Sequence, residues 1–193
     1  MFEARAENRM TFRRLVQRIR VPAGFVLAPL LVIASHPTFE WLVAGVPLAL
    51  AGLSIRAWAS GYLKKNRELT IAGPYAYTRN PLYLGTFIMG TGVAISTGSL
   101  WFVAVFAGLY LLVYVTVMFA EAETLSQLFT EEFVAYRREV PLFFPRLTPY
   151  PNRLQRRFEL SAYLRHREYR AAIGVLVVYG LMAAKHVIAG MSR

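Results

Sequence analysis

Five apolar runs alternate with polar segments along the chain. They cover residues 21–35, 39–63, 82–97, 100–120 and 171–191. At about 1.5 Å per residue, the second, fourth and fifth runs are long enough as helices to cross a hydrocarbon core of about 30 Å. The first and third are shorter and need flanking residues or local thinning of the bilayer. The pattern predicts an all-α fold, a polytopic membrane helix bundle with about five transmembrane helices and with interfacial helices on its cytoplasmic side.

Basic residues gather in three of the intervening segments. Residues 1–20, 61–80 and 121–170 together hold 19 of the 22 Lys and Arg residues, whereas the connections at 35–39 and 97–99 hold none. Basic loops tend to remain in the cytoplasm. We therefore expect a protein of the bacterial inner membrane whose N-terminus and three basic segments are cytoplasmic and whose two uncharged turns lie outside.

The composition narrows the class of protein. Hydrophobic residues make up 56% of the chain and charged residues 17%, with a net charge of +11 and no cysteine. An ordinary soluble domain has fewer apolar and more charged residues. Because the basic charge is divided by topology, we expect it to reflect membrane orientation and not nucleic-acid binding. The lack of cysteine excludes disulfides, thiol catalysis and thiolate metal sites, and we expect no metal site.

The charge pattern divides the chain into four parts. Residues 1–20 form a basic cytoplasmic arm, and residues 21–147 form the membrane core with four spans. Residues 148–170 form a basic interfacial segment suited to an anionic lipid leaflet, and residues 171–193 form a C-terminal transmembrane helix. The arm and first run also resemble a secretory signal peptide, but the length of the arm and the further spans favour a retained helix.

The first chemically informative segment precedes the third apolar run and reads Gly73-Pro74-Tyr75-Ala76-Tyr77-Thr78-Arg79-Asn80-Pro81-Leu82-Tyr83-Leu84-Gly85. Gly73-Pro74 predicts a turn, Pro81 fits the first turn of a helix, and Asn80 is placed to cap it. One interpretation is a helix start with interfacial aromatic residues. The alternative is a ligand site, because arginine can bind a carboxylate and tyrosine rings can stack on a purine.

The second segment follows the fourth apolar run. Glu121 lies where that run meets the cytoplasm, a position at which a carboxylate needs a partner. Apolar residues then recur at helical spacing and predict an amphipathic helix, for which Thr130 is a candidate cap and Glu131 and Glu132 form the first turn. The apolar stripe consists of Leu125, Leu128, Phe129, Phe133, Tyr136 and Val140.

Taken together and in this order, the two segments resemble the integral membrane methyltransferases of the isoprenylcysteine carboxyl methyltransferase family, and more distantly the phospholipid N-methyltransferases. The resemblance covers roughly residues 45–147. It implies S-adenosylmethionine bound at the cytoplasmic face and a lipophilic acceptor that enters from the bilayer. Matching the family motifs implies catalytic roles for Asn80 and Glu121. The implied cofactor-binding residues are Tyr75, Arg79, Asn80, Pro81, Tyr83, Leu84, Gly85, Glu121 and Glu123.

Three departures from the family pattern affect the chemistry. Asn80 replaces the family histidine and cannot titrate, so it is a poor candidate for a general base. Ala122 replaces the second glutamate of a pair, with Glu123 displaced around the helix. Residues 115–120 lack the arginine that lipid-methylating members often carry. The acceptor is therefore open among an isoprenylcysteine-like carboxylate and other lipid-soluble thiols, acids or amines.

Two other functions compete with methyl transfer. The Arg-x-Pro-x-Tyr-x-Gly stretch is also similar to membrane sterol reductases that use NADPH, but those usually have glutamate after the glycine, where this chain has Thr86. A non-enzymatic scaffold or transporter subunit is the other alternative. Transport sites usually place polar pairs at the middle of the bilayer, whereas the polar groups here cluster at one face.

Two charged sites lie outside the motifs. Arg56 interrupts the second apolar run and is within reach of the cytoplasmic interface, so we expect it to snorkel, with the acceptor pocket as the alternative. Lys185 and His186 lie near the end of the last run, where we expect an anchor at the outer interface.

Overall fold

The computed structural model describes residues 30–64 and 68–191, and this part of the chain is helical without strands. Its elements are α2 (Phe39–Ser60), the 3₁₀ helix η1 (Gly73–Ala76), α3 (Pro81–Ser96), α4 (Leu100–Leu128), α5 (Thr130–Glu139), α6 (Leu160–Arg165) and α7 (Tyr169–Met191). Residues 30–34 are helical as well. The predicted all-α membrane bundle is confirmed. The expected arm at 1–20 and most of the expected first span lie outside the described residues.

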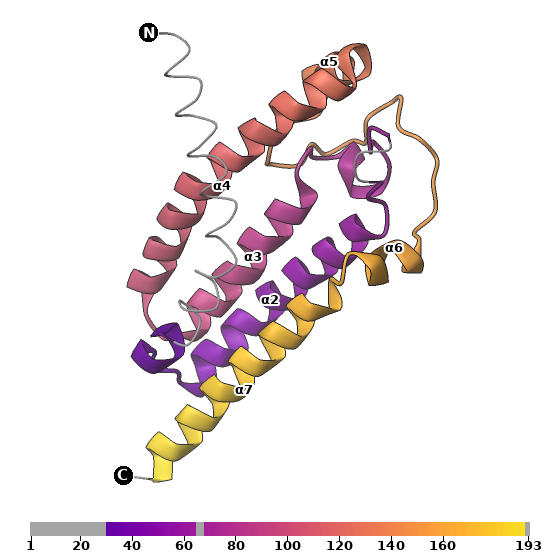
Figure 1. Cartoon of the computed structure of the whole chain (residues 1–193). Helices are drawn as coiled ribbons and strands as arrows, with labels where there is room; N and C mark the ends of the chain where they lie inside the picture. Colours follow the sequence, from indigo (N-terminus) through magenta and orange to yellow (C-terminus); the bar gives the residue numbers. More distant parts are fainter. Residues whose placement is uncertain (1–29, 65–67, 192–193) are drawn as a thin grey trace, which may run out of the picture.

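Three of the described helices, α2, α4 and α7, are long and apolar enough to cross a membrane. Another apolar helix, α3, has only 16 residues, in agreement with the short third run of the sequence. In the bundle, α2 and α3 lie side by side, α4 flanks α3, and α7 runs along α2 (Figure 1).

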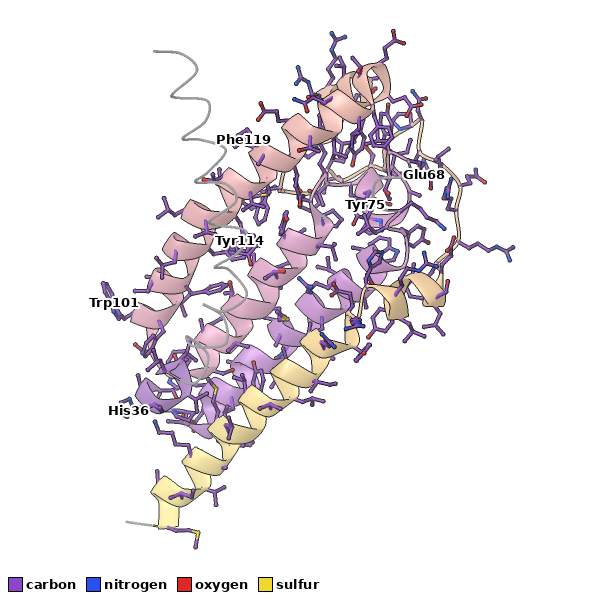
Figure 2. All side chains as sticks on the ribbon, in the orientation of Figure 1. His36, Glu68, Tyr75, Trp101, Tyr114 and Phe119 are labelled. Atoms are coloured by element: carbon purple, nitrogen blue, oxygen red, sulfur yellow. The ribbon has the colours of Figure 1, made fainter. Side chains whose placement is uncertain are left out.

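The two ends of the bundle differ in what they carry. One end holds η1, α5, α6 and the connections between them, and we call it the motif end (Figure 1). The other, the far end, holds the short turns before α2 and α4 and the C-terminal part of α7. Tyr75 and Glu68 lie at the motif end, and His36 and Trp101 lie near the far end (Figure 2). Both sequence motifs are therefore at the same end of the helices.

Glycines allow α2 and α3 to pack backbone against backbone. A Cβ atom at Gly52 would lie 2.3 Å from the amide nitrogen of Met89 and 2.5 Å from the carbonyl oxygen of Gly85. A Cβ atom at Gly92 would lie 2.5 Å from the amide nitrogen of Ala49. Small residues commonly permit such close contact between membrane helices. The pair forms a rigid support from which the first turn of α3 projects toward the motif end.

The helix α4 extends beyond the apolar run that predicted it. It continues for eight residues past Ala120 to Leu128. Phe129 then occupies both the C-cap position of α4 and the N-cap position of α5. Thr130 is therefore the first residue of α5, and its predicted role as a cap is wrong. In the apolar stripe, Phe133, Tyr136 and Val140 are buried, and Leu128 is 54% exposed.

Lys185 holds the far end together. Its Nζ atom donates hydrogen bonds to the carbonyl oxygens of Val32, Ile33 and Ser35, at 3.1, 2.5 and 2.6 Å. These carbonyls lie at the end of the helical residues 30–34, where the backbone acceptors have no partner within the helix. The Nδ1 atom of His186 lies 3.1 Å from the carbonyl oxygen of Pro37. The predicted anchor thus binds protein backbone.

Candidate functional site

The first motif folds as a tight turn against the end of the bundle. Gly73 adopts a φ of +56°, a conformation that residues with a Cβ atom rarely adopt. Pro74 and Tyr75 follow in η1 and are buried, and Pro81 begins α3. The local sequence therefore brings the residues of the first motif back over the N-terminus of α3.

Residues 136–150, which we call the clamp segment, hold this turn in place. The backbone amides of Arg79, Arg146 and Tyr150 donate to the carbonyls of Pro141, Tyr77 and Ala76 at 3.0, 2.9 and 2.9 Å. The hydroxyls of Thr78 and Tyr136 donate to the carbonyls of Phe143 and Tyr75 at 2.8 and 2.6 Å. The conformation of the first motif is thus fixed by residues about 65 positions later in the chain.

Asn80 takes part in the same contact. It occupies the N-cap position of α3, as predicted, but its side chain makes no capping hydrogen bond. Instead, Nδ2 donates to the carbonyl oxygen of Leu142 at 2.9 Å, and the residue is 9% exposed. The predicted side-chain cap is therefore wrong, because the clamp segment supplies a competing acceptor. Its predicted catalytic role remains a prediction.

The two motifs meet at Tyr83 and Glu121. The Tyr83 hydroxyl, on the first turn of α3, donates a hydrogen bond of 2.7 Å to Oε1 of Glu121 on α4. Tyr110 fixes the backbone of Tyr83 through a hydrogen bond of 2.6 Å to its carbonyl oxygen. The ring of Tyr114 lies 5.2 Å from that of Tyr83, within the range of aromatic contact. The Tyr83 hydroxyl is therefore the hydrogen-bond partner expected for a carboxylate at the position of Glu121.

Two buried polar atoms at the motif end stand apart from this network. Among the described residues, the Tyr75 hydroxyl and the Arg79 Nε atom are buried side-chain groups without a hydrogen-bond partner. Such groups are costly to leave unsatisfied, and in native proteins they often mark a binding or catalytic role. Both belong to the predicted cofactor-binding set.

Burial governs the ionisation of these two groups. It raises the pKa of Tyr75 well above its ordinary value, and Tyr136 and the carboxylates of Glu121 and Glu168 raise that pKa further. Burial also lowers the pKa of Arg79, with Tyr136 acting in the opposite direction. At neutral pH the Tyr75 phenol is thus a neutral donor close to acidic groups, and the Arg79 guanidinium is a partly buried cation.

The other predicted site residues have packing contacts. Pro81 is buried, and Leu84 packs on the cluster of Tyr110, Met118 and Phe143. Gly85 faces α2, where its Cβ atom would lie 2.7 Å from Cγ of Arg56. Glu123 is exposed on α4, two residues after Glu121. Contacts of these four residues with a cofactor remain predictions.

Sequence reasoning missed the partner of Arg56. The guanidinium pairs with Glu168, 112 positions later, through contacts of 3.0 Å from Nε and 2.7 Å from Nη2 to Oε2. Snorkelling of Arg56 to the interface remains a prediction, but its guanidinium ends on a protein carboxylate. The single charge of Arg56 within an apolar run indicated an unusual residue, but the sequence pattern did not indicate Glu168 as its partner. A pocket of about 180 Å³ adjoins the pair and is lined by Leu53, Ser54, Arg56, Ala57, Tyr163, Glu168 and Ala172.

Comparison with known proteins identifies the family. A sequence model of the phospholipid methyltransferase family matches residues 43–132, a range that contains both motifs. A curated relative, the cobalt-zinc-cadmium resistance protein CzcN of Cupriavidus metallidurans, is 35% identical over 157 residues, which cover 76% of this chain and 71% of that protein. The chain belongs to the phospholipid methyltransferase family. Membership supports a membrane methyltransferase in general and agrees with the resemblance found in the motifs.

A second curated relative carries a related name. The nickel-cobalt-cadmium resistance protein NccN of Alcaligenes xylosoxydans xylosoxydans is 34% identical over 139 residues, which cover 67% of this chain and 63% of that protein. No solved structure matches the chain.

Proposed function

We propose that the protein transfers a methyl group from S-adenosylmethionine to a lipophilic acceptor that enters from the bilayer. The observation that carries the proposal is the hydrogen bond between Tyr83 and Glu121, which joins the two family motifs in one site. The unpartnered Tyr75 hydroxyl and Arg79 Nε atom belong to η1 and to the turn before α3, at the same end of the bundle, and supply further polar groups for a ligand.

The residues present fit the chemistry of this cofactor. The Arg79 guanidinium is suited to its carboxylate, because arginine binds planar anions through more than one N–H group. Glu121 is suited to its ammonium or to a ribose hydroxyl, since an ionised carboxylate accepts several hydrogen bonds. Tyr75 and Tyr83 offer aromatic faces for the adenine or for the positively charged sulfonium.

The remaining predicted residues support this set. Asn80 holds the clamp segment through Leu142, and Pro81, Leu84 and Gly85 fix the first turn of α3 on which Tyr83 stands. Glu123 adds a second carboxylate on the same stretch of α4.

Methyl transfer requires little of the protein beyond positioning. The cofactor, when bound, would supply an electrophilic methyl group: the acceptor nucleophile would bond to the methyl carbon as the carbon–sulfur bond breaks, and S-adenosylhomocysteine would leave as the neutral thioether. The protein therefore needs to hold the two reactants in line and to exclude water. Cysteine is absent from the sequence, so the sulfur, oxygen or nitrogen nucleophile belongs to the acceptor.

We place the motif end on the cytoplasmic side of the bacterial inner membrane, with the acceptor delivered by the lipid phase. Arginines are frequent in the exposed segment between residues 151 and 158, where Arg153, Arg156 and Arg157 lie beside the exposed side chains of Leu154 and Phe158. Basic and apolar groups side by side suit the surface of an anionic leaflet. The acceptor is an isoprenylcysteine-like carboxylate or another lipid-soluble thiol, acid or amine.

The relatives are named for resistance to metals, and we propose that any such connection is indirect for this chain. Within residues 30–64 and 68–191, no group of three or more His, Cys, Asp or Glu side chains is placed to hold a metal ion. The proposed reaction itself needs no metal, because displacement at a sulfonium requires only that the acceptor and the methyl group be held in line.

Calorimetric titration of the detergent-purified protein with S-adenosylhomocysteine and with NADPH tests the proposal. Binding of S-adenosylhomocysteine alone, lost in the Glu121→Gln variant, is the expected result. Binding of NADPH alone would indicate the reductase, and binding of neither would reject both enzymes. A scan of lipophilic acceptors with a labelled methyl donor then narrows the second substrate.

A further inference from the structure

Arg56 joins α2 to α3 and to the turn before α7, beside the first turn of α3. Through Nε and Nη2 it binds Oε2 of Glu168, the residue that precedes α7. Through Nη1 it donates to the Leu82 carbonyl at 3.4 Å and to the Thr86 hydroxyl, both on α3. One guanidinium on α2 therefore connects α7 to the backbone next to Tyr83.

The backbone near Arg56 and the backbone near Glu168 both favour the contact between these two residues. Gly85 provides room for the Arg56 side chain to cross α3, because a Cβ atom there would lie 2.7 Å from Cγ of Arg56. Arg167 has a φ of +55° in the turn between α6 and α7, immediately before Glu168. Non-glycine residues adopt this conformation at a cost that the surrounding structure must offset. The side chains of Arg56 and Glu168 are only 20% and 12% exposed.

We infer that Glu168 is a positioning residue for the Tyr83–Glu121 site, acting through Arg56 on the first turn of α3. This assigns α7, which lies outside the region matched by the family, a part in shaping that site. The inference rests on the proposed function for its effect on cofactor binding. Its effect on the order of α3 is independent of that function.

A second ion pair offers a matched control. Lys64, shortly after α2, binds Glu159, shortly before α6, at 2.5 Å. This pair joins the same two parts of the chain as Arg56 and Glu168, but neither side chain has a hydrogen bond or ion pair to α3 among the contacts of the described residues. Replacing Glu159 thus tests whether any loss of charge in this segment has the same effect.

The test compares full-length Glu168→Gln, Glu159→Gln, Arg56→Lys and wild type in detergent. We measure hydrogen–deuterium exchange of peptides from the first turn of α3 and from residues 160–175, together with calorimetric affinity for S-adenosylhomocysteine. Glu168→Gln should increase exchange in the first turn of α3 and weaken binding roughly tenfold, since it leaves a partly buried arginine without its countercharge. Glu159→Gln should change binding by less than about twofold, because the pair has no hydrogen bond or ion pair to α3 among the described residues and its carboxylate is 42% exposed.

Arg56→Lys separates docking of α7 from positioning of α3. Lysine retains the charge for Glu168 but lacks the planar fork that reaches Leu82 and Thr86 at the same time. It should therefore weaken cofactor binding about as much as Glu168→Gln while exchange in residues 160–175 stays close to wild type.

The outcomes distinguish the two proposals. Faster exchange in Glu168→Gln that is confined to residues 160–175, with the first turn of α3 unchanged, would overturn the positioning role. An equal loss of cofactor affinity in Glu159→Gln would do the same. If wild type binds no S-adenosylhomocysteine, the proposed function fails, and exchange in the first turn of α3 still decides the positioning role.

Discussion

The phenolic oxygen of Tyr83 and Oε1 of Glu121 lie 2.7 Å apart, although 38 positions separate the two residues in the chain. One stands on the first turn of α3 and the other near the end of α4. The contact brings a phenol and a carboxylate to the place where the family motifs meet. A change to either residue should therefore affect ligand binding more than folding.

Tyr83→Phe should weaken binding of S-adenosylhomocysteine several-fold, and Glu121→Gln should weaken it more, because the carboxylate contributes a charge to the site. The hydrogen bond lies at an exposed position, so thermal stability should fall by no more than about 1 kcal/mol in either variant. Calorimetry and thermal unfolding in detergent provide the measurements. Glu132→Gln, at an exposed position on α5, serves as the control, and an equal loss of affinity there would remove the special role of Glu121.

Tyr75→Phe and Tyr136→Phe should have opposite consequences. The Tyr75 hydroxyl is buried without a partner, so its removal should leave the ligand-free protein equally or more stable while weakening cofactor binding. The Tyr136 hydroxyl makes a buried hydrogen bond of 2.6 Å to the Tyr75 carbonyl, and its removal should destabilise the protein by about 1–3 kcal/mol. Thermal unfolding without ligand measures both. Destabilisation by Tyr75→Phe would show that the phenol has a structural partner.

Alkaline pH should destabilise the fold through the same tyrosines. Burial raises the pKa of Tyr75 and of Tyr136 in the folded protein above the ordinary value of 10.0. The unfolded chain therefore releases these protons first, so that stability is fully present below about pH 10 and falls as the pH rises further. Thermal unfolding between pH 8 and 11 measures the effect. The slope above pH 10 should be smaller in Tyr75→Phe, and an unchanged slope would contradict the burial of that phenol.

Gly52→Ala should destabilise the bundle by about 1–3 kcal/mol, because the new methyl group would lie 2.3 Å from the backbone nitrogen of Met89. Gly174 on α7 is the matched control. A Cβ atom there has no neighbour within 4 Å among the described residues, so Gly174→Ala should be neutral or stabilising, by up to about 1 kcal/mol. Thermal unfolding of the two variants compares them directly. Equal stability would indicate that α2 and α3 are less closely packed.

Lys185→Met should loosen the far end of the bundle. The substitution leaves the carbonyl oxygens of Ile33 and Ser35 without this donor, at a cost of about 1–3 kcal/mol, whereas the Val32 carbonyl still accepts from Ser35. Hydrogen–deuterium exchange should increase in residues 30–38 and not at the motif end. Since the chain has no native cysteine, a disulfide between cysteines introduced near positions 33 and 185 provides a second measure of this contact.

The apolar runs of the sequence predicted the membrane-length helices well where each run was continuous. The predicted spans at 39–63, 82–97 and 100–120 correspond to α2, α3 and α4. The end of α4 was placed too early because polar residues begin at Glu121. A helix can leave the bilayer without ending, however, and no proline or glycine interrupts the sequence between Ala120 and Leu128.

The sequence offered candidate site residues but not the contacts between them. The two motifs indicated Tyr83 and Glu121, Glu121 because a carboxylate at a membrane boundary needs a partner and Tyr83 because it stands in the segment that resembles the family. The carbonyl of Leu142 that binds Asn80 belongs to a segment without regular structure, whose path no periodic pattern describes. The pairing of Arg56 with Glu168 depends on how α7 packs on α2, and this long-range choice leaves no local signal.

The shortness of α3 limits the distance between the turn at the far end and the candidate site. Its 16 residues rise about 24 Å, less than the roughly 30 Å of a typical hydrocarbon core. Counted from the turn at the far end, the first turn of α3 and the Tyr83 hydroxyl therefore lie below the level that a full-length span would reach. In the proposed reaction, a lipid-anchored acceptor would meet its methyl donor at the depth of its own upper chain, and it would not have to be lifted out of the bilayer.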